Sequence, residues 1–169
     1  MTVRAANEND IEQIKAIFAQ AREYFRENGI DQWQTGYPED FVIKHDINSH
    51  YAYVLCDGEK VVAVCSVMHT PDPSYAQIDG KWHTKDGYYT IHRVAVDGRS
   101  KGQGLASLLF SFAEKEIMGG KGQLRADTHR DNHSMQRLLE KNGFERCGII
   151  RLAEGSDTGK ERIAFDKTV

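Results

Sequence analysis

The sequence predicts a mixed α/β fold that forms a single domain over residues 1–169. Strand-like runs of β-branched and aromatic residues alternate along the chain with stretches whose apolar residues recur three and four positions apart. A chain of 169 residues is long enough to bury a continuous core without disulfides or metals. It contains no internal repeat and no linker-like stretch that would divide it.

A short strand over residues 2–5 and an amphipathic helix are expected first. Asn9 or Asp10 can cap the start of that helix, and Gly29 can end it. Its buried stripe consists of Ile11, Ile14, Phe18, Ala21 and Phe25.

A second, weaker helix is expected over residues 39–47. The strands that follow, over residues 51–55 and 61–67, are joined by the turn pair Asp57-Gly58 and form a hairpin. Residues 70–87 contain two prolines and two glycines, so a long loop with at most one short irregular element is expected there.

The second half of the chain resumes with a strand over residues 88–96. The next helix is expected to bury Leu105, Leu108, Leu109 and Phe112. The remaining elements are a strand over residues 123–128, a helix over residues 132–141 with Met135, Leu138 and Leu139 inward, and strands that open at Gly143-Phe144 and alternate around Ile163 and Phe165.

The composition excludes several classes of protein. A net charge of −3 gives no global support for binding nucleic acid. Cys56, Cys65 and Cys147 are scattered, so reduced, half-buried strand cysteines are expected in place of a zinc or redox pair. No apolar stretch approaches the ~20 residues that cross a bilayer, and the first residues do not resemble a signal peptide. A cytoplasmic protein without a membrane partner is therefore expected.

A short basic loop with two glycines follows the strand over residues 88–96. Gly102 and Gly104 lack a Cβ atom, so phosphate oxygens can approach the backbone N–H groups at the start of the next helix. Arg99 and Lys101 add positive charge beside them. The alternative is a tight turn with solvated basic residues, because short glycine patterns are common.

The residue sequence of this loop differs from those of two other phosphate-binding loops. Leu105 follows Gly104 where a P-loop needs Lys-Ser or Lys-Thr, and Ser107 replaces the third glycine of a dinucleotide fingerprint. Arg99-x-x-Gly102-x-Gly104 instead resembles the pyrophosphate motif Arg/Gln-x-x-Gly-x-Gly/Ala of the GNAT superfamily of N-acetyltransferases. A second block, residues 132–144, resembles the helix-and-strand segment of that family that usually ends in Gly-Phe.

The resemblance covers residues 3–165 and implies a mixed, strongly twisted sheet of about six to seven strands with helices on both faces. The strand ending at Val96 would diverge from the strand after Gly122 and admit the pantetheine arm of acetyl-CoA. Asn132 would support that arm with its side-chain amide or serve as a helix cap. The other implied cofactor contacts are Val94, Ala95, Val96, Arg99, Lys101, Gly102, Gln103, Gly104, Leu105 and Ala106.

His92 is the candidate general base. An alkylamine has a pKa of about 10.4, so a proton acceptor would assist its attack at neutral pH. The two-residue strand period is expected to place the side chains of His92 and Val94 on one face. The stretch also resembles the arylalkylamine branch of the family, which has a histidine at the matching offset. The alternative is a hydrogen-bonded strand histidine without a catalytic role.

The usual general acid of the family is missing, because Leu139 stands where the family often has a tyrosine. Tyr51, Tyr88 or Tyr89 could replace it. A thiol with a pKa near 8.5 is also a tolerable leaving group as its anion.

The acceptor site is expected near Trp33 and Tyr37, with Phe41 beside them, although large aromatics more often pack a core. Acidic residues of the long loop would attract a cationic amine or face water. They are Asp72, Asp79 and Asp86, with Trp82 between them.

An alternating set of possible ligands raises the question of a metal site. The set is Asp127, His129, Asp131 and His133. A helix that begins near Asn132 breaks the alternation, so no metal is expected there.

The sequence thus predicts an enzyme that moves an acetyl group from acetyl-CoA to a primary amine, most simply a small molecule. The alternatives are acetylation of a protein N-terminus or lysine, and a module that senses acetyl-CoA without turnover. The expected partner is a small-molecule amine or a peptide, and a homodimer is compatible with the sequence.

Overall fold

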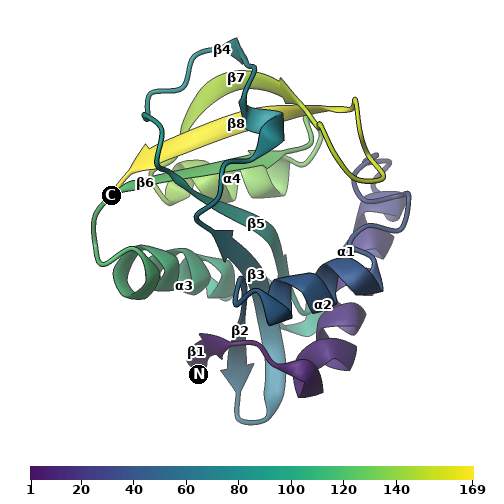
Figure 1. Cartoon of the computed structure of the whole chain (residues 1–169). Helices are drawn as coiled ribbons and strands as arrows, with labels where there is room; N and C mark the ends of the chain where they lie inside the picture. The colour runs from purple at the N-terminus through teal and green to yellow at the C-terminus, as the bar shows by residue number, and fades with distance from the viewer.

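The computed structural model describes residues 1–169 and contains one sheet of order β1-β2-β3-β5-β6-β8-β7-β4 (Figure 1). All neighbouring strands are antiparallel except β5 and β6. The mixed fold is confirmed, with eight strands where about seven were expected, because the two-residue β4 is too short to leave a sequence pattern. The strands are β1 (Thr2–Ala5), β2 (Ala52–Asp57), β3 (Lys60–Met68), β4 (Asp79–Gly80), β5 (Tyr89–Val96), β6 (Gln123–Thr128), β7 (Glu145–Arg151) and β8 (Glu161–Thr168).

Helices cover both faces of the sheet, as predicted. One core cluster joins α1 and α2 to the sheet, and the other joins α3 and α4 to the opposite face (Figure 1). The helices are α1 (Ile11–Glu27), α2 (Asp40–Asn48), α3 (Leu105–Phe112) and α4 (His133–Lys141). Short 3-10 turns, η1 (Glu8–Asp10), η2 (Pro73–Tyr75) and η3 (Gly98–Ser100), and a π-helical extension of α3, η4 (Ala113–Ile117), complete the chain. None of the helices combines the length and the apolar character that crossing a membrane requires.

The start of the first helical segment agrees with the prediction in part, because Asp10 is the N-cap residue of α1 but makes no side-chain capping hydrogen bond to it. Asn7, and not Asn9, caps η1 by accepting a hydrogen bond from the N–H of Asn9. The carboxylate of Asp10 accepts one from the N–H of Asn7 in return and pairs with Arg4 at 2.7 Å. These contacts form a capping box that fixes the chain between β1 and α1.

The buried face of α3 is also shifted from the predicted one. Leu108 is 47% exposed, whereas Phe110 is 1% exposed. The buried positions are Leu105, Ala106, Leu109, Phe110 and Ala113. Phe110 takes its place in the core by packing edge-on against Phe144. The predicted inward residue of α4, Leu139, is buried, and all three cysteines are free and buried.

The strands β5 and β6 diverge, which confirms the prediction. They pair only at Tyr89 with Leu124 and at Thr90 with Arg125. Beyond these pairs β5 continues beside β3, and β6 continues beside β8. The edge of β5 toward its carboxyl end is therefore left without a neighbouring strand on that side.

A β-bulge changes the direction of side chains along β5. Ser66 pairs with His92 and Val64 with Ala95, so Arg93 and Val94 together oppose one residue of β3. Arg93 has a φ of 55°, a left-handed conformation that is rare for a residue other than glycine. The extra residue shifts the strand's alternation.

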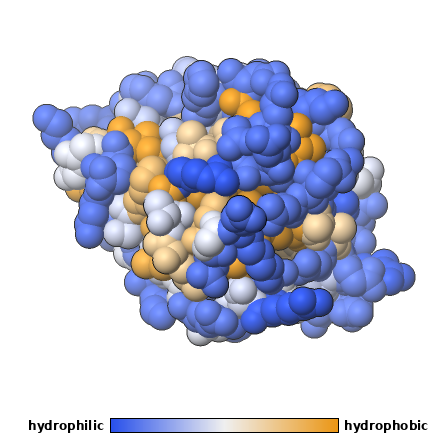
Figure 2. All heavy atoms as spheres, turned by 90° about the horizontal axis from the view of Figure 1, so that it is seen from below, coloured by the Kyte–Doolittle hydropathy of each residue, from blue (hydrophilic) through white to orange (hydrophobic).

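The predicted common face of His92 and Val94 is therefore wrong. Val94 packs with Ile91 against the core cluster under α3, whereas the ring of His92 lies between carboxylates of other segments. The face shown in Figure 2 is mostly hydrophilic, with small apolar areas divided by hydrophilic side chains.

Candidate active site

A cavity of about 660 Å³ opens where β5 and β6 diverge. Both strands, the start of α2, the residue before α4, Leu152 and residues 154–157 contribute to its wall. The lining includes His92, Arg93 and Val94 of β5, Asp127 and Thr128 of β6, and Asn132. The volume lies within the roughly 300–1,000 Å³ of typical small-molecule sites.

The loop between β5 and α3 presents free backbone donors. Gly102 and Gly104 have φ values of 78° and 75°, a conformation that other residues adopt only with strain. No backbone N–H group from Lys101 through Ala106 donates to a protein acceptor. With the positive end of the α3 dipole behind them, these groups are free to donate hydrogen bonds to an anion.

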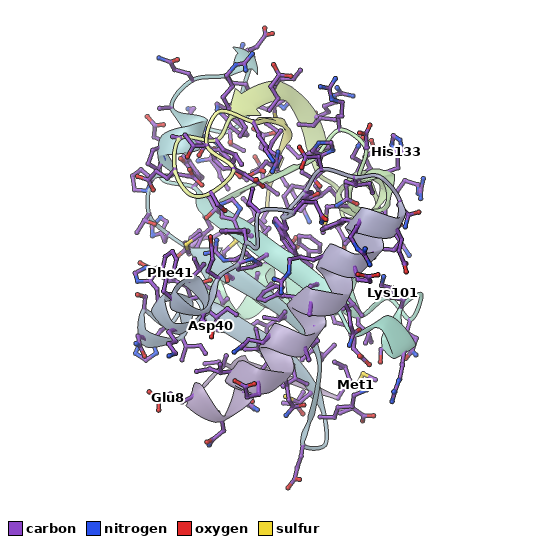
Figure 3. All side chains as sticks on the ribbon, turned by 90° about the vertical axis from the view of Figure 1, so that its right-hand side faces the viewer. Met1, Glu8, Asp40, Phe41, Lys101 and His133 are labelled. Carbon is purple, nitrogen blue, oxygen red and sulfur yellow. The ribbon has the colours of Figure 1, made fainter.

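The two basic side chains of this loop differ in their surroundings. Arg99 is exposed, and the Nζ atom of Lys101 lies 4.1 Å from the ring centroid of Tyr24 in a cation–π contact. In Figure 3, Lys101 lies on the opposite side of α1 from Phe41, which projects from α2 at the edge of the cavity. The loop therefore lies apart from the α2 end of the cavity, and none of the residues from Arg99 to Ala106 lines the cavity.

His92 lies between two carboxylates. Its Nε2 atom is 3.0 Å from Oδ2 of Asp72, and its Nδ1 atom is 3.7 Å from Oδ2 of Asp127. The hydroxyl group of Tyr75 donates a hydrogen bond of 2.7 Å to the same oxygen of Asp127. The His92 side chain is 15% exposed, so these contacts are shielded from bulk water.

The surroundings of Asp72 and Tyr75, which lie near His92, determine whether these two side chains carry a proton. Burial alone would raise the pKa of Asp72, but the hydrogen bond from His92 and the N–H of Ser74 outweigh it and lower that pKa. Burial first, and the charge of Asp127 second, raise the pKa of Tyr75, so its phenol keeps its proton. Since ionised Asp72 can only accept, Nε2 of His92 is the donor in this contact.

The acceptor candidates both line the cavity. Trp33 is buried and packs edge-on against Phe18 and Phe25 at centroid distances of 5.7 and 5.5 Å, so its core role is confirmed. The hydroxyl group of Tyr37 accepts a hydrogen bond from Arg93. Their place in acceptor binding stays a prediction.

A buried ion pair fixes Arg93 and, through it, Tyr37. The guanidinium group donates to both carboxylate oxygens of Asp46, at 2.7 and 2.9 Å. Burial raises the pKa of Tyr37, although the charge of Arg93 opposes the shift. The phenol is therefore protonated and held in place at the wall of the cavity.

The tyrosines named as substitutes for the missing general acid do not line the cavity. Tyr89 stacks on His69 at 4.1 Å, and Tyr88 packs against Arg125 at 3.9 Å. Tyr51 contacts His45 at a centroid distance of 6.1 Å. Leu139 does line the cavity, as an apolar side chain.

Asn132 is a helix cap, which confirms one of the two interpretations. Its Oδ1 atom accepts a hydrogen bond of 3.1 Å from the N–H of Met135. Its Nδ2 atom donates to Gln32 at 2.9 Å. The residue also lines the cavity, so the cofactor contact remains a prediction.

The alternating acidic and histidine residues do not form a metal cluster. Asp127 faces His92, and His129 lies 3.7 Å from Asp131, while His133 is exposed at the start of α4. The turn before α4 separates their side chains.

Sequence analysis missed two contributors to the site. Tyr75 lies in η2, inside a segment expected to be an irregular loop, and no pattern marks it. The loop over residues 153–160 is joined to the segment before α2, because Oγ1 of Thr35 lies 2.9 Å from Oγ of Ser156 and 3.2 Å from a carboxylate oxygen of Asp157. Ser156 and Asp157 of this loop line the cavity.

Comparison with known proteins identifies the family. The model of the acetyltransferase (GNAT) family matches residues 14–144. The chain belongs to this family. It is therefore an acyltransferase with the GNAT fold.

Individual relatives agree with this assignment. The chain is 25% identical over 142 residues to "Uncharacterized N-acetyltransferase YesJ" of Bacillus subtilis (strain 168), covering 82% of this chain and 78% of YesJ. It is 34% identical to a GNAT family acetyltransferase of Streptococcus agalactiae 2603, with a TM-score of 0.86 over 99% of this chain and 95% of that one. An aminoglycoside 6'-N-acetyltransferase complexed with coenzyme A shares the fold, with 15% identity and a TM-score of 0.61 over 99% and 97% of the two chains.

Proposed function

We propose that this GNAT enzyme transfers an acetyl group from acetyl-CoA to a small primary amine, with His92 as the general base. The observation that carries the proposal is the position of His92, which borders a cavity beside the open edge of β5 and lies between two carboxylates. A base next to the only unpaired stretch of that strand edge is suited to a reaction at a thioester carbonyl.

The donor is held by the loop and by β5. The pyrophosphate accepts hydrogen bonds from the free N–H groups between Lys101 and Ala106, and Arg99 adds a positive charge. The pantetheine arm lies along β5 near Val94 and Val96, where β6 has diverged. A neighbour of the same fold that is complexed with coenzyme A supports this choice of donor.

The chemistry requires one proton acceptor. The neutral amine attacks the thioester carbonyl, and Nδ1 of His92 accepts the proton that the attacking nitrogen loses, directly or through a water molecule. Asp72 and Asp127 stabilise the resulting imidazolium. Coenzyme A leaves as a thiolate and then takes up a proton, so the missing family tyrosine is not required.

The cavity favours a cationic acceptor of small size. Acidic side chains outnumber arginines in its wall, and the positive charge of an ammonium group is attracted to such a wall. The acidic residues are Glu39, Asp46, Asp72, Asp127, Glu154 and Asp157, and the arginines are Arg93 and Arg162. The cavity volume of about 660 Å³ lies within the range of typical small-molecule sites, which favours a small amine over a protein chain.

The test is release of coenzyme A thiol across a panel of alkylamines, amino acids and peptides. Turnover with small amines and little turnover with peptides is the expected result. Faster turnover of peptides than of small amines would show that the acceptor is a protein N-terminus or lysine and not a small amine. Binding of acetyl-CoA without thiol release for any member of the panel would support the sensor module and overturn the proposal.

A further inference from the structure

A second cluster of reactive side chains lies away from the cavity. His83 follows β4, Cys147 belongs to β7 and Asp166 to β8. One ligand atom from each lies within 4.8 Å of the others. None of the three residues lines the active-site cavity, so the cluster plays no part in the acetyl transfer described above.

The distances match the edges of a metal coordination sphere. The Nδ1 atom of His83 is 3.5 Å from Sγ of Cys147 and 2.9 Å from Oδ1 of Asp166. Tetrahedral zinc places its sulfur and nitrogen ligands about 3.5 Å apart and nitrogen and oxygen ligands about 3.3 Å apart. The first pair already fits, and the second needs only a small outward movement of the half-exposed His83 ring.

A backbone irregularity at Cys147 directs its side chain toward His83 and Asp166. The register of β7 against β8 shifts between Arg146 and Gly148, so Cys147 is the extra residue of a β-bulge. Bulges redirect a side chain relative to the regular alternation. Here the buried thiol faces His83 and Asp166.

Hydrogen bonds orient the carboxylate as they do in metal sites. Oδ2 of Asp166 accepts from the N–H groups of His83 and Thr84 and from the hydroxyl group of Thr84. Oδ1 lies 2.9 Å from Nδ1 of His83. Partners that fix one carboxylate oxygen while the other points to the ligands are typical of metal coordination.

The charge of the cluster suits a divalent cation. A thiolate and a carboxylate together balance two positive charges. The nearby guanidinium group of Arg125 is held behind Thr84, to whose hydroxyl it donates at 2.9 Å, and stacks on Trp82 at 4.2 Å. The exposed side of His83 leaves room for a water molecule as fourth ligand.

A nucleophilic role for the cysteine fits less well. Burial, and next the hydrogen bond with Asp166, raise the pKa of the Cys147 thiol to about 12. The metal-free thiol is therefore protonated at neutral pH and is a poor nucleophile.

We propose that His83, Cys147 and Asp166 bind a zinc-type divalent transition metal with water as the fourth ligand. The metal would join the segment after β4 to β7 and β8. Tyr75 packs in the same apolar cluster as Cys147. The ion would thus stabilise the segment that carries Asp72 and Tyr75 to the active site.

Metal binding by the full chain tests this proposal without measuring catalysis. After removal of metal with a chelator, the parent protein should bind one equivalent of Zn²⁺ and melt at a higher temperature. Cobalt should give the absorption of a thiolate-to-cobalt charge transfer. His83→Gln and Cys147→Ser should each weaken binding about 100-fold or more.

Control variants at another histidine and another cysteine distinguish binding at the proposed site from binding of Zn²⁺ elsewhere on the protein. His133→Gln replaces an exposed histidine (Figure 3), and Cys56→Ser replaces another buried free cysteine, so both should bind Zn²⁺ as the parent does. Should Cys147→Ser fail to fold, His83→Gln decides alone, because its side chain is half exposed. No binding of Zn²⁺ at micromolar metal by the parent, parental affinity in His83→Gln, or cobalt binding without the charge-transfer band would each overturn the proposal.

Discussion

The Nε2 atom of His92 lies 3.0 Å from Oδ2 of Asp72, although the residues belong to different segments. Asp72 is the N-cap of η2 and also accepts a hydrogen bond of 2.8 Å from the N–H of Ser74. Its backbone N–H donates to the hydroxyl group of Tyr88. These contacts fix the carboxylate, and through it the ring of His92, before substrate binds.

Asp72→Asn should therefore slow turnover about tenfold and leave acetyl-CoA affinity unchanged. The amide keeps the size of the side chain but removes the charge that stabilises the imidazolium. Steady-state kinetics and calorimetry with acetyl-CoA measure the two effects. Asp86→Asn, at an exposed position of the same segment, is the control and should behave as the parent. Equal rates for Asp72→Asn and the parent would remove Asp72 from the mechanism.

Gly104→Val should abolish the rise in melting temperature that acetyl-CoA produces. Gly104 has a φ of 75°, and a Cβ atom there would meet no protein atom but would stand where phosphate oxygens approach. Gly119→Val is a matched control, since Gly119 has a φ of 68° and an equally open Cβ direction outside the loop. Both variants should lose similar stability, and only Gly119→Val should keep the thermal shift. A full shift in Gly104→Val would show that the pyrophosphate binds elsewhere.

Asp157→Asn should destabilise the protein by about 3 kcal/mol at neutral pH. In the parent protein the buried guanidinium group of Arg162 lies 3.0 Å from the carboxylate of Asp157. The substitution leaves this guanidinium group without its charge partner. Burial would raise the pKa of Asp157, but Lys160 and Arg162 outweigh it and lower that pKa.

The stabilisation by Asp157 is therefore complete above the ordinary Asp pKa of about 3.9 and is lost as the pH falls through the lower folded value. Urea unfolding of both proteins from pH 7 to pH 2 measures this. The two curves should converge only at the acidic end, and a constant difference across the range would contradict the ion pair.

Much of the fold and the donor loop could be predicted from local sequence. The glycine spacing at Gly102 and Gly104 and the apolar residues of α1 act within a few positions of the chain, so their patterns are visible without a structure. The divergence at Val96 followed from the family resemblance. The second helix and the hairpin also lie within one or two residues of their predicted bounds.

The structural features that the sequence did not predict depend on contacts between segments that are distant in the chain. The bulge at Arg93 is a property of how β5 pairs with β3, and a non-glycine residue with positive φ has no sequence signature. The approach of Asp72 to His92 and of Tyr75 to Asp127 joins the long segment to β5 and β6. Whether an acidic loop residue faces water or a histidine is decided only by that packing.

We propose that His92 accepts the proton of the attacking amine, and the pH dependence of turnover measures this step. Turnover of the parent should rise with pH along a single limb, and folded His92→Ala should lose roughly 10²–10⁴-fold in rate and the limb with it. Circular dichroism and acetyl-CoA affinity should be unchanged, because the N–H groups proposed to bind the pyrophosphate lie elsewhere, from Lys101 to Ala106. A folded His92→Ala protein with the parental rate and pH profile would contradict the claim.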